Sequence, residues 1–340
     1  MIASDLLLTG KDLTRAQAKG LFRKFLKGSF DPETAKQVLV LLRKKGEHSN
    51  ELSGLVDAVR SIEKPIRTNA RFLVDGCGTG GDGKNTFNIS TAACLVAAGA
   101  GAQVAKHGNK GISSRCGSSD LLEGLGVRIA VSPKRMLKAF KEANFGYFHA
   151  PLYHPVFKRA QPVRAELAKK RIRTVFNLAG PFLNPLRPQK QLIGVWNRNL
   201  LGMMAETARN LKLKHALIVW NEAGYDEFTT KDSTVVVELK GKKISSDKIV
   251  PTRFHLRPNT KHDLAGGNVK KNCAIVLRVL SGQDHSSKLD VVLLNAGAIL
   301  YVSGKAKNIK EGIRLAQQSI FSESALRSLK RLVKISRDSR

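Results

Sequence analysis

Residues 74–126 read VDGCGTGGDGKNTFNISTAACLVAAGAGAQVAKHGNKGISSRCGSSDLLEGLG, and the remaining chain can be interpreted outward from them. An apolar segment, residues 72–74, predicts a strand, and an alanine-rich segment after residue 91 predicts a helix. The glycines between them remove side chains, so backbone N–H groups can face an anion at the start of that helix. The helix N-terminus adds its partial positive charge. The pattern predicts a phosphate or pyrophosphate site.

A second unit of the same kind follows directly. Residues 103–106 predict a strand, residues 107–110 a polar loop, and Ser118 or Ser119 the cap of a helix over residues 120–124. This rhythm of strand, loop and helix is typical of an α/β domain with parallel strand pairing. Both polar loops then lie at the carboxyl ends of the strands, where such folds bind ligands.

Residues 1–65 predict helices instead. Thr14 and Gln17 form a capping box, Asp31-Pro32 starts a second helix, and Ser49 can cap a third. Gly28 and Gly46 end the first two. We expect these helices to pack a core, with a subunit interface as the alternative.

The remaining chain is predicted to contain both strands and helices. Further strands are expected at 71–75, 127–129, 192–196, 215–220 and 234–239, and helices at 133–144, 164–170, 201–211, 268–281, 289–303 and 310–334. Small residues at 295–298 predict a close contact between helices. The acidic pair Asp226-Glu227 follows one of the strands, so it is expected beside the glycine loop.

Composition narrows the class of protein. The chain has 340 residues, 42% of them hydrophobic, which excludes wholesale disorder. No apolar run is as long as a membrane span, no secretory signal is recognisable, and four scattered cysteines fit a reduced, cytoplasmic protein. The net charge of +31 favours anionic substrates or nucleic acid, while a generally basic proteome would explain it without any function.

Three loops can share one site: the glycine loop, the loop from Lys106 to Asn109, and Asp226-Glu227. Backbone donors and a lysine suit a polyphosphate, and adjacent carboxylates suit Mg²⁺. Taken singly, each of these features has a structural explanation. A glycine-rich turn is common in α/β proteins, an Asp-Glu pair is often a solvated turn, and the histidines at 107 and 154 could be structural residues with satisfied hydrogen bonds. Their common position at strand ends favours a magnesium-diphosphate site. The loop fits neither a Walker motif nor a dinucleotide fingerprint.

The motifs themselves resemble one family, the anthranilate phosphoribosyltransferases, over nearly the whole chain. The resemblance rests on Gly78-Thr79-Gly80-Gly81-Asp82, Asn88-Ile89-Ser90-Thr91, Lys106-His107-Gly108-Asn109, Arg173-Thr174-Val175-Phe176-Asn177, Gly180-Pro181 and Asp226-Glu227. The Lys-His-Gly-Asn block also occurs in related nucleoside phosphorylases, and the Gly-Thr-Gly-Gly-Asp block narrows the choice.

The resemblance implies a fold and an activity. The fold is a small helical domain over residues 1–68, joined by helices from about 155–190, and an α/β domain with a mixed central sheet over residues 69–340. The family transfers the phosphoribosyl group of 5-phosphoribosyl diphosphate (PRPP) to anthranilate, in tryptophan biosynthesis, with two Mg²⁺ ions and no covalent intermediate. It usually forms a homodimer through the helical domain.

The resemblance also implies site residues. Those for PRPP are Gly78, Thr79, Gly80, Gly81, Asp82, Thr86, Asn88, Ser90, Thr91 and Lys106. Those for anthranilate are Gly78, His107, Asn109, His154, Arg164, Gly180 and Pro181. Those for Mg²⁺ are Ser90, Asp226 and Glu227. His107, Asn109 and Arg164 would position the substrate.

Four places depart from the family pattern: Lys110 for an arginine, Trp220-Asn221 for His-Gly, a longer connector at 168–172 that bears on the placement of Arg164, and Asn268 for an aspartate. Two alternatives therefore stay open. One is a nucleic-acid-binding paralogue with a basic groove, and the other is a nucleoside phosphorylase that needs no Mg²⁺.

Overall fold

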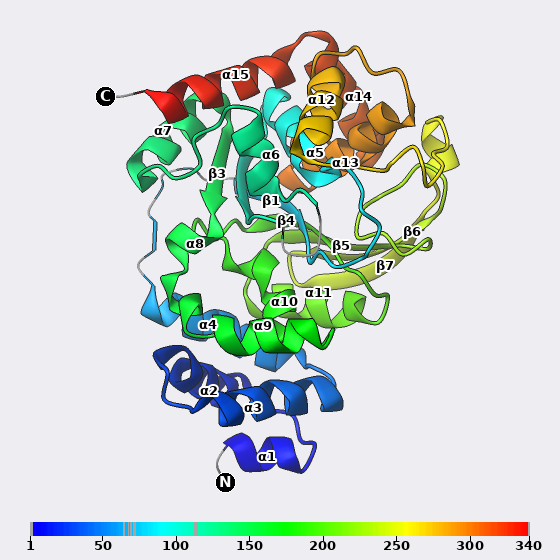
Figure 1. Cartoon of the computed structure of the whole chain (residues 1–340). Helices are drawn as coiled ribbons and strands as arrows, with labels where there is room; N and C mark the ends of the chain where they lie inside the picture. Colours follow the sequence, from blue (N-terminus) through cyan, green and yellow to red (C-terminus); the bar gives the residue numbers. More distant parts are fainter. Residues whose placement is uncertain are drawn as a thin grey trace.

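The structure is a computed structural model that describes residues 3–63, 65, 66, 68, 70, 73–111 and 115–338. Helices from the N-terminal end lie at one pole of the molecule and the last helix lies at the other, with a seven-stranded sheet between them (Figure 1). A small helical part thus precedes an α/β part, as the sequence predicted. None of the described helices is long and apolar enough to cross a membrane.

The strands are β1 (Leu73–Gly78), β2 (Gln103–Gly108), β3 (Phe145–His149), β4 (Lys190–Gly194), β5 (His215–Asn221), β6 (Thr234–Lys240) and β7 (Lys243–Ile249). The helices of the first half are α1 (Ala3–Leu8), α2 (Arg15–Lys27), α3 (Pro32–Lys45), α4 (Ser49–Ile62), α5 (Ile89–Gly99), α6 (Ser118–Gly124), α7 (Pro133–Ala143), α8 (Ala150–Tyr153) and the 3₁₀ helix η1 (Pro155–Lys158). Those of the second half are α9 (Gln161–Lys169), α10 (Val175–Ala179), η2 (Gly180–Leu183), α11 (Leu200–Asn210), η3 (Pro251–Phe254), α12 (Val269–Leu280), α13 (Ser287–Ser303), α14 (Ile309–Phe321) and α15 (Ser324–Arg337).

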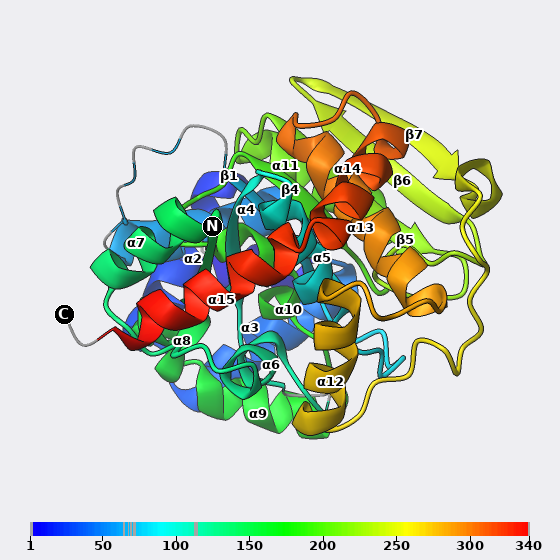
Figure 2. The same ribbon diagram turned by 90° about the horizontal axis from the view of Figure 1, so that it is seen from above.

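The sheet is mixed, in the order β3-β2-β1-β4-β5-β6-β7. The first five strands pair in parallel and the last two pair antiparallel, at one edge of the sheet (Figure 2). Gly78 pairs with Gly194, so the loops after β1 and β4 begin side by side. This register brings segments far apart in sequence to one edge of the sheet.

Two apolar cores cover the two faces of the sheet. The alternation of β5 shows why: Leu217 and Val219 belong to the core with α5 and α13, whereas Ala216 and Ile218 belong to the core with the N-terminal helices, α10 and α11. The side-chain period of a strand sends alternate residues to opposite faces. The second core therefore joins the N-terminal helices to the sheet.

Several predicted boundaries were wrong. His48, not Ser49, is the N-cap of α4, and Gly117 precedes α6, where Asp120 accepts its N–H at 2.8 Å. The single helix expected over residues 310–334 is two, because the chain turns at Glu323, whose φ is 59°. Residues 127–129 form no strand. Of the strand expected at 71–75, Arg71 and Phe72 lie outside the described residues.

Two strands were not predicted. β7 is an edge strand whose side chains are mostly exposed and polar, so it lacks the apolar alternation that marks a strand. β3 is short and contains a glycine between its aromatic residues. Both are fixed by pairing with a neighbouring strand, which is tertiary information.

The close contact predicted at residues 295–298 is present between α13 and α14. A Cβ on Gly312 would lie 2.2 Å from the Gly297 carbonyl oxygen.

We expect Gly312→Ala to lower the free energy of unfolding by about 1–3 kcal/mol through overpacking, measured by urea denaturation. The matched control is Gly202→Ala in α11, where nothing lies within 4 Å of the added Cβ. That change should stabilise by about 0.4–1 kcal/mol, and equal losses in both variants would contradict the packing argument.

Candidate active site

The acidic pair after β5 lies directly under the glycine loop after β1. The backbone N–H of Gly80 donates to Asp226 Oδ2 at 3.0 Å, and that of Ser90 donates to Glu227 Oε1 at 3.0 Å. Ser90 is in the first turn of α5, so the start of this helix faces a carboxylate. Two of the three loops that the sequence analysis grouped are thus brought together.

Two paired strand residues leave room for this arrangement. A Cβ on Gly78 would lie 2.1 Å from Asp226 Oδ2, and one on Gly194 would lie 1.5 Å from the Asp226 carbonyl oxygen. Real Cβ atoms do not come so close to other heavy atoms. The acidic turn can therefore reach the ends of β1 and β4 only because both positions are glycine.

The acidic residues are crowded and dehydrated. Burial, reinforced by the charge of Asp82, raises the pKa of Asp226 to about 7. Burial, together with the charges of Asp226 and Asp82, raises the pKa of Glu227 well above its ordinary value. Among the described residues, Glu227 Oε2 and Asp82 Oδ2 are buried without a hydrogen-bond partner. These carboxylates favour a bound cation.

A hard divalent cation fits this set of donors. The part of the chain that the structure describes holds no group of three or more His, Cys, Asp or Glu residues able to hold a metal ion. Mg²⁺ is commonly bound through one or two carboxylates, completed by water and substrate phosphate oxygens. The pair Asp226-Glu227 with its unpartnered oxygen matches that incomplete kind of site.

The glycine loop itself is held open toward the acidic pair. Gly80 and Gly81 have φ values of 65° and 81°, a region that side chains disfavour. Arg173 donates to the Gly81 carbonyl and stacks on Trp196, with its guanidinium carbon 4.5 Å from the ring centroid. The Thr79 hydroxyl donates to the Gly194 carbonyl at 3.2 Å. The loop is therefore anchored to neighbours on both sides.

Lys106 lies beneath this loop. It is 2% exposed, and its Nζ donates to the Gly76 carbonyl at 2.7 Å. Burial alone would lower its pKa, but the neighbouring Cys94 and Asp75 outweigh that effect and raise it. Burial raises the pKa of Asp75 to about 6, although Lys106 opposes this. Lys106 thus keeps its positive charge under the loop.

The polar residues at the start of α5 divide into two groups. The Asn88 side chain is used within the protein: it donates to the Cys116 carbonyl at 3.0 Å and accepts from Asn272 at 2.9 Å. Thr86 forms an isolated β-bridge with Ala265. By contrast, the Thr91 hydroxyl oxygen is buried with no hydrogen-bond partner among the described residues. The described part of the protein thus makes no use of the Thr91 hydroxyl.

A cavity of about 450 Å³ opens on the other side of Gly78. Its lining includes all the predicted anthranilate residues, namely Gly78, His107, Asn109, His154, Arg164, Gly180 and Pro181. Cys77 and Gly78 also border the small space beside the acidic pair. The cavity and the acidic pair are therefore two halves of one site that meet at the end of β1.

Arg164 is one of two basic residues that line this cavity, with Lys158. It lies half-buried on α9, with its guanidinium carbon 5.3 Å from the Phe176 ring centroid and 5.9 Å from that of Phe157. Burial lowers the pKa of Arg164. No carboxylate of the described residues forms an ion pair with it. The longer connector at 168–172 leaves Arg164 in the cavity wall.

Two histidines form the opposite polar group of the cavity. His107 Nε2 and His154 Nε2 are 3.2 Å apart, and the rings are nearly perpendicular, at 82°. Burial, with the nearby His154 and Lys106, lowers the pKa of His107 well below its ordinary value. His107 is therefore neutral at neutral pH.

Two departures from the family pattern have structural roles. Lys110 pairs with Glu123 at 3.1 Å, away from the cavity. The Asn221 side chain donates to the Thr229 and Thr234 hydroxyls and accepts from the Ala223 backbone at 3.0 Å. Asn221 therefore shapes the turn that carries the acidic pair.

Some residues of the site were missed in the sequence. Phe157, Lys158, Gln161 and Leu183 line the cavity, and Glu63 contacts His154. Phe176 was inside a recognised motif. Phe157, Lys158, Gln161 and Leu183 lie within a few residues of predicted site residues, but no motif marked them, whereas Glu63 is far from His154 in the chain. The sequence of a short helix does not predict which of its hydrophobic or charged side chains will line a cavity.

The chain matches two family models. One, described as "Glycosyl transferase family, a/b domain", covers residues 70–326. The other, described as "Glycosyl transferase family, helical bundle domain", covers residues 5–61. Together they span both parts of the fold.

Among curated proteins, the chain is 41% identical over 328 residues to an anthranilate phosphoribosyltransferase of Rubrobacter xylanophilus, covering 96% of this chain and 95% of the relative. Among solved structures, the anthranilate phosphoribosyltransferase of Thermus thermophilus superposes with a TM-score of 0.93 at 38% identity, covering 99% and 100% of the two chains.

The Saccharomyces cerevisiae enzyme of the same name has been solved in complex with PRPP and Mg and in complex with 4-fluoroanthranilate. These structures superpose with TM-scores of 0.87 and 0.88 at 27% identity, each covering 98% of this chain and 96% of the yeast chain.

Proposed function

The chain is an enzyme of the anthranilate phosphoribosyltransferase family, and on that premise we propose that it transfers the phosphoribosyl group of PRPP to the amine of anthranilate. The products are N-(5-phosphoribosyl)anthranilate and diphosphate, in tryptophan biosynthesis. One observation carries the proposal: a buried acidic pair meets, at Gly78, a cavity whose Arg164 pairs with no carboxylate of the described residues. An acceptor anion and a metal-bound diphosphate need such adjoining halves.

In this proposal the diphosphate end holds PRPP. Backbone N–H groups of the loop from Gly78 to Asp82 and the start of α5 face the phosphates, with Lys106 as the cation beneath them. The full set is Gly78, Thr79, Gly80, Gly81, Asp82, Thr86, Asn88, Ser90, Thr91 and Lys106. Asn88 and Thr86 act by shaping the loop, because the Asn88 amide already binds protein and the Thr86 backbone forms a β-bridge with Ala265.

Ser90, Asp226 and Glu227 would hold two Mg²⁺ ions. When bound, the ions neutralise charge on the departing diphosphate. The unpartnered Glu227 Oε2 and the raised pKa of both carboxylates, caused by burial and by neighbouring acidic groups, support this assignment. The chain's own part is to place these oxygens rigidly beside the loop.

The cavity would take anthranilate, with Arg164 pairing its carboxylate and Pro181 and Phe176 beside its ring. The amine attacks C1 of the ribose directly: the C1–N bond forms, the bond from C1 to the diphosphate oxygen breaks, and one amine proton leaves. No covalent enzyme intermediate is needed. Catalysis rests on positioning and on charge stabilisation.

We also propose a homodimer through the N-terminal helices. Leu8 in α1 is 71% exposed, which supports an apolar contact there. The basic surface is compatible with nucleic acid, but a groove that binds a phosphate backbone would not carry the buried acidic pair. A nucleoside phosphorylase would likewise need no Mg²⁺ site.

A fluorescence assay tests the function. We expect anthranilate fluorescence to fall only when the protein, PRPP and Mg²⁺ are all present, and chelation of the metal to stop the reaction. Phosphate-dependent cleavage of a nucleoside without Mg²⁺ would favour the phosphorylase instead. A gel shift that weakens steeply with salt, without anthranilate turnover, would favour the nucleic-acid-binding paralogue.

A further inference from the structure

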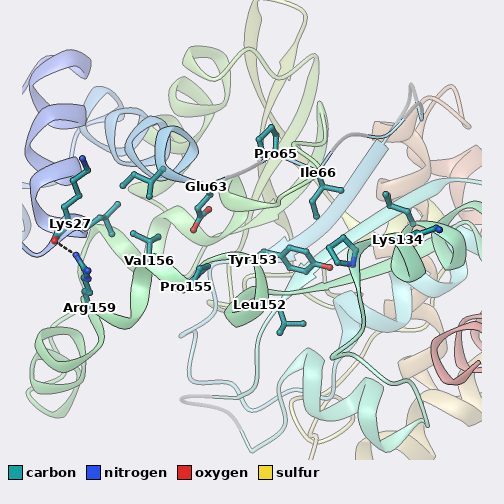
Figure 3. A pocket seen from close by; sticks show the side chains of 14 residues that line it. Lys27, Glu63, Pro65, Ile66, Lys134, Leu152, Tyr153, Pro155, Val156 and Arg159 are labelled. Atoms are coloured by element: carbon teal, nitrogen blue, oxygen red, sulfur yellow. Dashed lines mark hydrogen bonds between the residues drawn. The ribbon is translucent and has the colours of Figure 1, made fainter. Parts of the chain in front are cut away.

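A second cavity, of about 920 Å³, lies where the N-terminal helices meet the α/β part (Figure 3). The ends of α2 and α4, the start of α7, and the segment of α8 and η1 line it, and we call it the junction cavity. Its volume is within the range of pockets that bind small molecules. None of its described lining residues also lines the substrate cavity or the space beside the acidic pair, so it is a separate site.

α8 and η1 form the wall between the two cavities. Residues at a spacing of three face the substrate cavity, namely Pro151, His154 and Phe157. The residues between them face the junction cavity, namely Leu152, Tyr153, Pro155, Val156 and Arg159. A spacing of three is the period of a tightly wound helix, which sends side chains to different sides of one short segment. The junction cavity therefore lies directly behind the substrate cavity.

Most of the lining of the junction cavity is apolar. Ile66 and Leu137 pack against the core that contains α5 and α13, whereas Ile62 and Val156 pack against the core of the N-terminal helices. Leu152 is 48% exposed, although it is a large apolar side chain in a concave surface. Apolar side chains gathered at such a surface mark a binding site. The middle of the cavity is therefore suited to an apolar body.

The charged side chains lie toward the ends of the junction cavity. Figure 3 shows Lys27 and Arg159 at one end and Lys134 at the other. Arg159 donates to the Lys27 carbonyl, whereas Lys134 is exposed and pairs with no carboxylate of the described residues. Glu63, the acidic residue of the described lining, contacts His154, with 2.6 Å between its Oε2 and Nδ1. The Lys134 end therefore carries a positive charge without a partner.

Tyr153 adds a hydrogen-bond donor to the Lys134 end. Figure 3 shows its ring in the cavity, with the hydroxyl on the side of Lys134. The ring packs on Phe148, with 5.6 Å between the centroids, which fixes its direction. The hydroxyl forms no hydrogen bond with the part of the chain that the structure describes, although a half-buried tyrosine usually finds a partner. Burial raises the pKa of Tyr153 to about 12, so the hydroxyl keeps the proton that it can donate.

We propose that the junction cavity is a second ligand site, which binds an organic anion with an apolar body, such as a medium-chain carboxylate. Lys134 and the Tyr153 hydroxyl hold the anionic head, and the apolar body lies along Leu137, Ile66 and Val156. A small polar anion would leave the apolar lining in water, and an organic cation would face Lys134. The bound anion contacts both parts of the fold and the back of the substrate-cavity wall.

Octanoate is the probe that tests this site, and octanol is its matched control. Octanol has the same chain without the charge, so the comparison isolates the head group. We expect octanoate to displace the fluorescent dye anilinonaphthalene sulfonate from the protein at a concentration at least about fivefold lower than octanol, the effect of one partly exposed ion pair. Equal potency of the two compounds would overturn the proposal.

Tyr153→Phe and Lys134→Ala remove the donor and the charge one at a time. We expect each variant to weaken octanoate binding about fivefold, through the loss of one hydrogen bond or one ion pair, and to leave octanol binding unchanged. Lys141→Ala, which removes an exposed cation of the same helix outside the cavity, is the matched control and should change neither. Octanoate affinity equal to that of the wild-type protein in both folded variants would contradict the assignment of the head group and overturn the proposal.

Two further variants exclude other locations and other occupants. Leu152→Glu places a negative charge in the junction cavity and should abolish octanoate binding, whereas Leu277→Glu, at an exposed leucine of α12, should not. Arg164→Ala removes a cation of the substrate cavity and should leave octanoate binding unchanged. A loss in Arg164→Ala would place the probe in the substrate cavity, and a changed oligomeric state of Leu152→Glu in light scattering would mean that a second copy covers the junction cavity. Either result would overturn the proposal, and neither measurement needs turnover.

Discussion

Asp226→Asn is expected to abolish Mg²⁺-dependent turnover while the protein stays folded. Asparagine keeps the acceptor for the Gly80 N–H, which Asp226 now binds at 3.0 Å, but it removes the charge that holds the cation. A metal ion at a departing diphosphate supplies several kcal/mol, so we expect a loss in kcat on the order of a thousandfold or more. The measurement is anthranilate consumption across a range of Mg²⁺ concentrations.

Stability provides an independent check on this variant. Burial and the charge of Asp82 raise the pKa of Asp226 to about 7, so its charge is unfavourable in the metal-free fold. The metal-free variant should therefore melt no lower than the wild-type protein. The control is Asp232→Asn, a change in the same turn whose side chain the proposal leaves outside the metal site. Retention of most Mg²⁺-dependent activity by Asp226→Asn would disprove the metal assignment.

Arg164→Ala is expected to raise the KM for anthranilate roughly a hundredfold, the cost of leaving the partner of a charged pair unmatched. The KM for PRPP should hardly change, because the glycine loop and the acidic pair are on the other side of Gly78. The melting temperature should not fall, since burial lowers the pKa of Arg164 and no carboxylate of the described residues forms an ion pair with it. Steady-state kinetics in each substrate and a thermal melt are the measurements.

Lys169→Ala, an exposed cation at the end of the same helix, is the control for general loss of positive charge. It should leave both KM values unchanged. An equal rise in both KM values for Arg164→Ala would mean that Arg164 supports the whole site instead of binding one substrate.

The predictions that the structure confirms are those whose cause is local. The capping box of Thr14 and Gln17, the Asp31-Pro32 start, and the glycine ends at 28 and 46 are all present, because a few neighbouring residues satisfy the helix ends themselves. The grouping of Lys106 with the acidic pair also followed from local reasoning, since residues after parallel strands meet at one edge. The family assignment agrees with that grouping.

The structural features that were not predicted depend on contacts between residues that are distant in the sequence. Glu63 sits after a helix with no motif around it, and only the path of the chain brings it to His154. The polar strand β7 exists because β6 offers it hydrogen bonds. Asn88 was expected to bind phosphate, but its amide is already bonded to Cys116 and Asn272. The domain boundary at residues 68 and 69 and the roles of the site residues stay predictions.

The paired glycines at the ends of β1 and β4 also restrict which single amino-acid substitutions this protein can tolerate. Every amino-acid replacement reachable from a glycine codon by one nucleotide change adds at least a Cβ. At position 78 that atom would collide with the Asp226 carboxylate, and at position 194 with its backbone. Neither codon can change alone without displacing the acidic turn. Lys110 and Asn221 differ from these glycines, because their side chains have partners of their own and crowd no backbone.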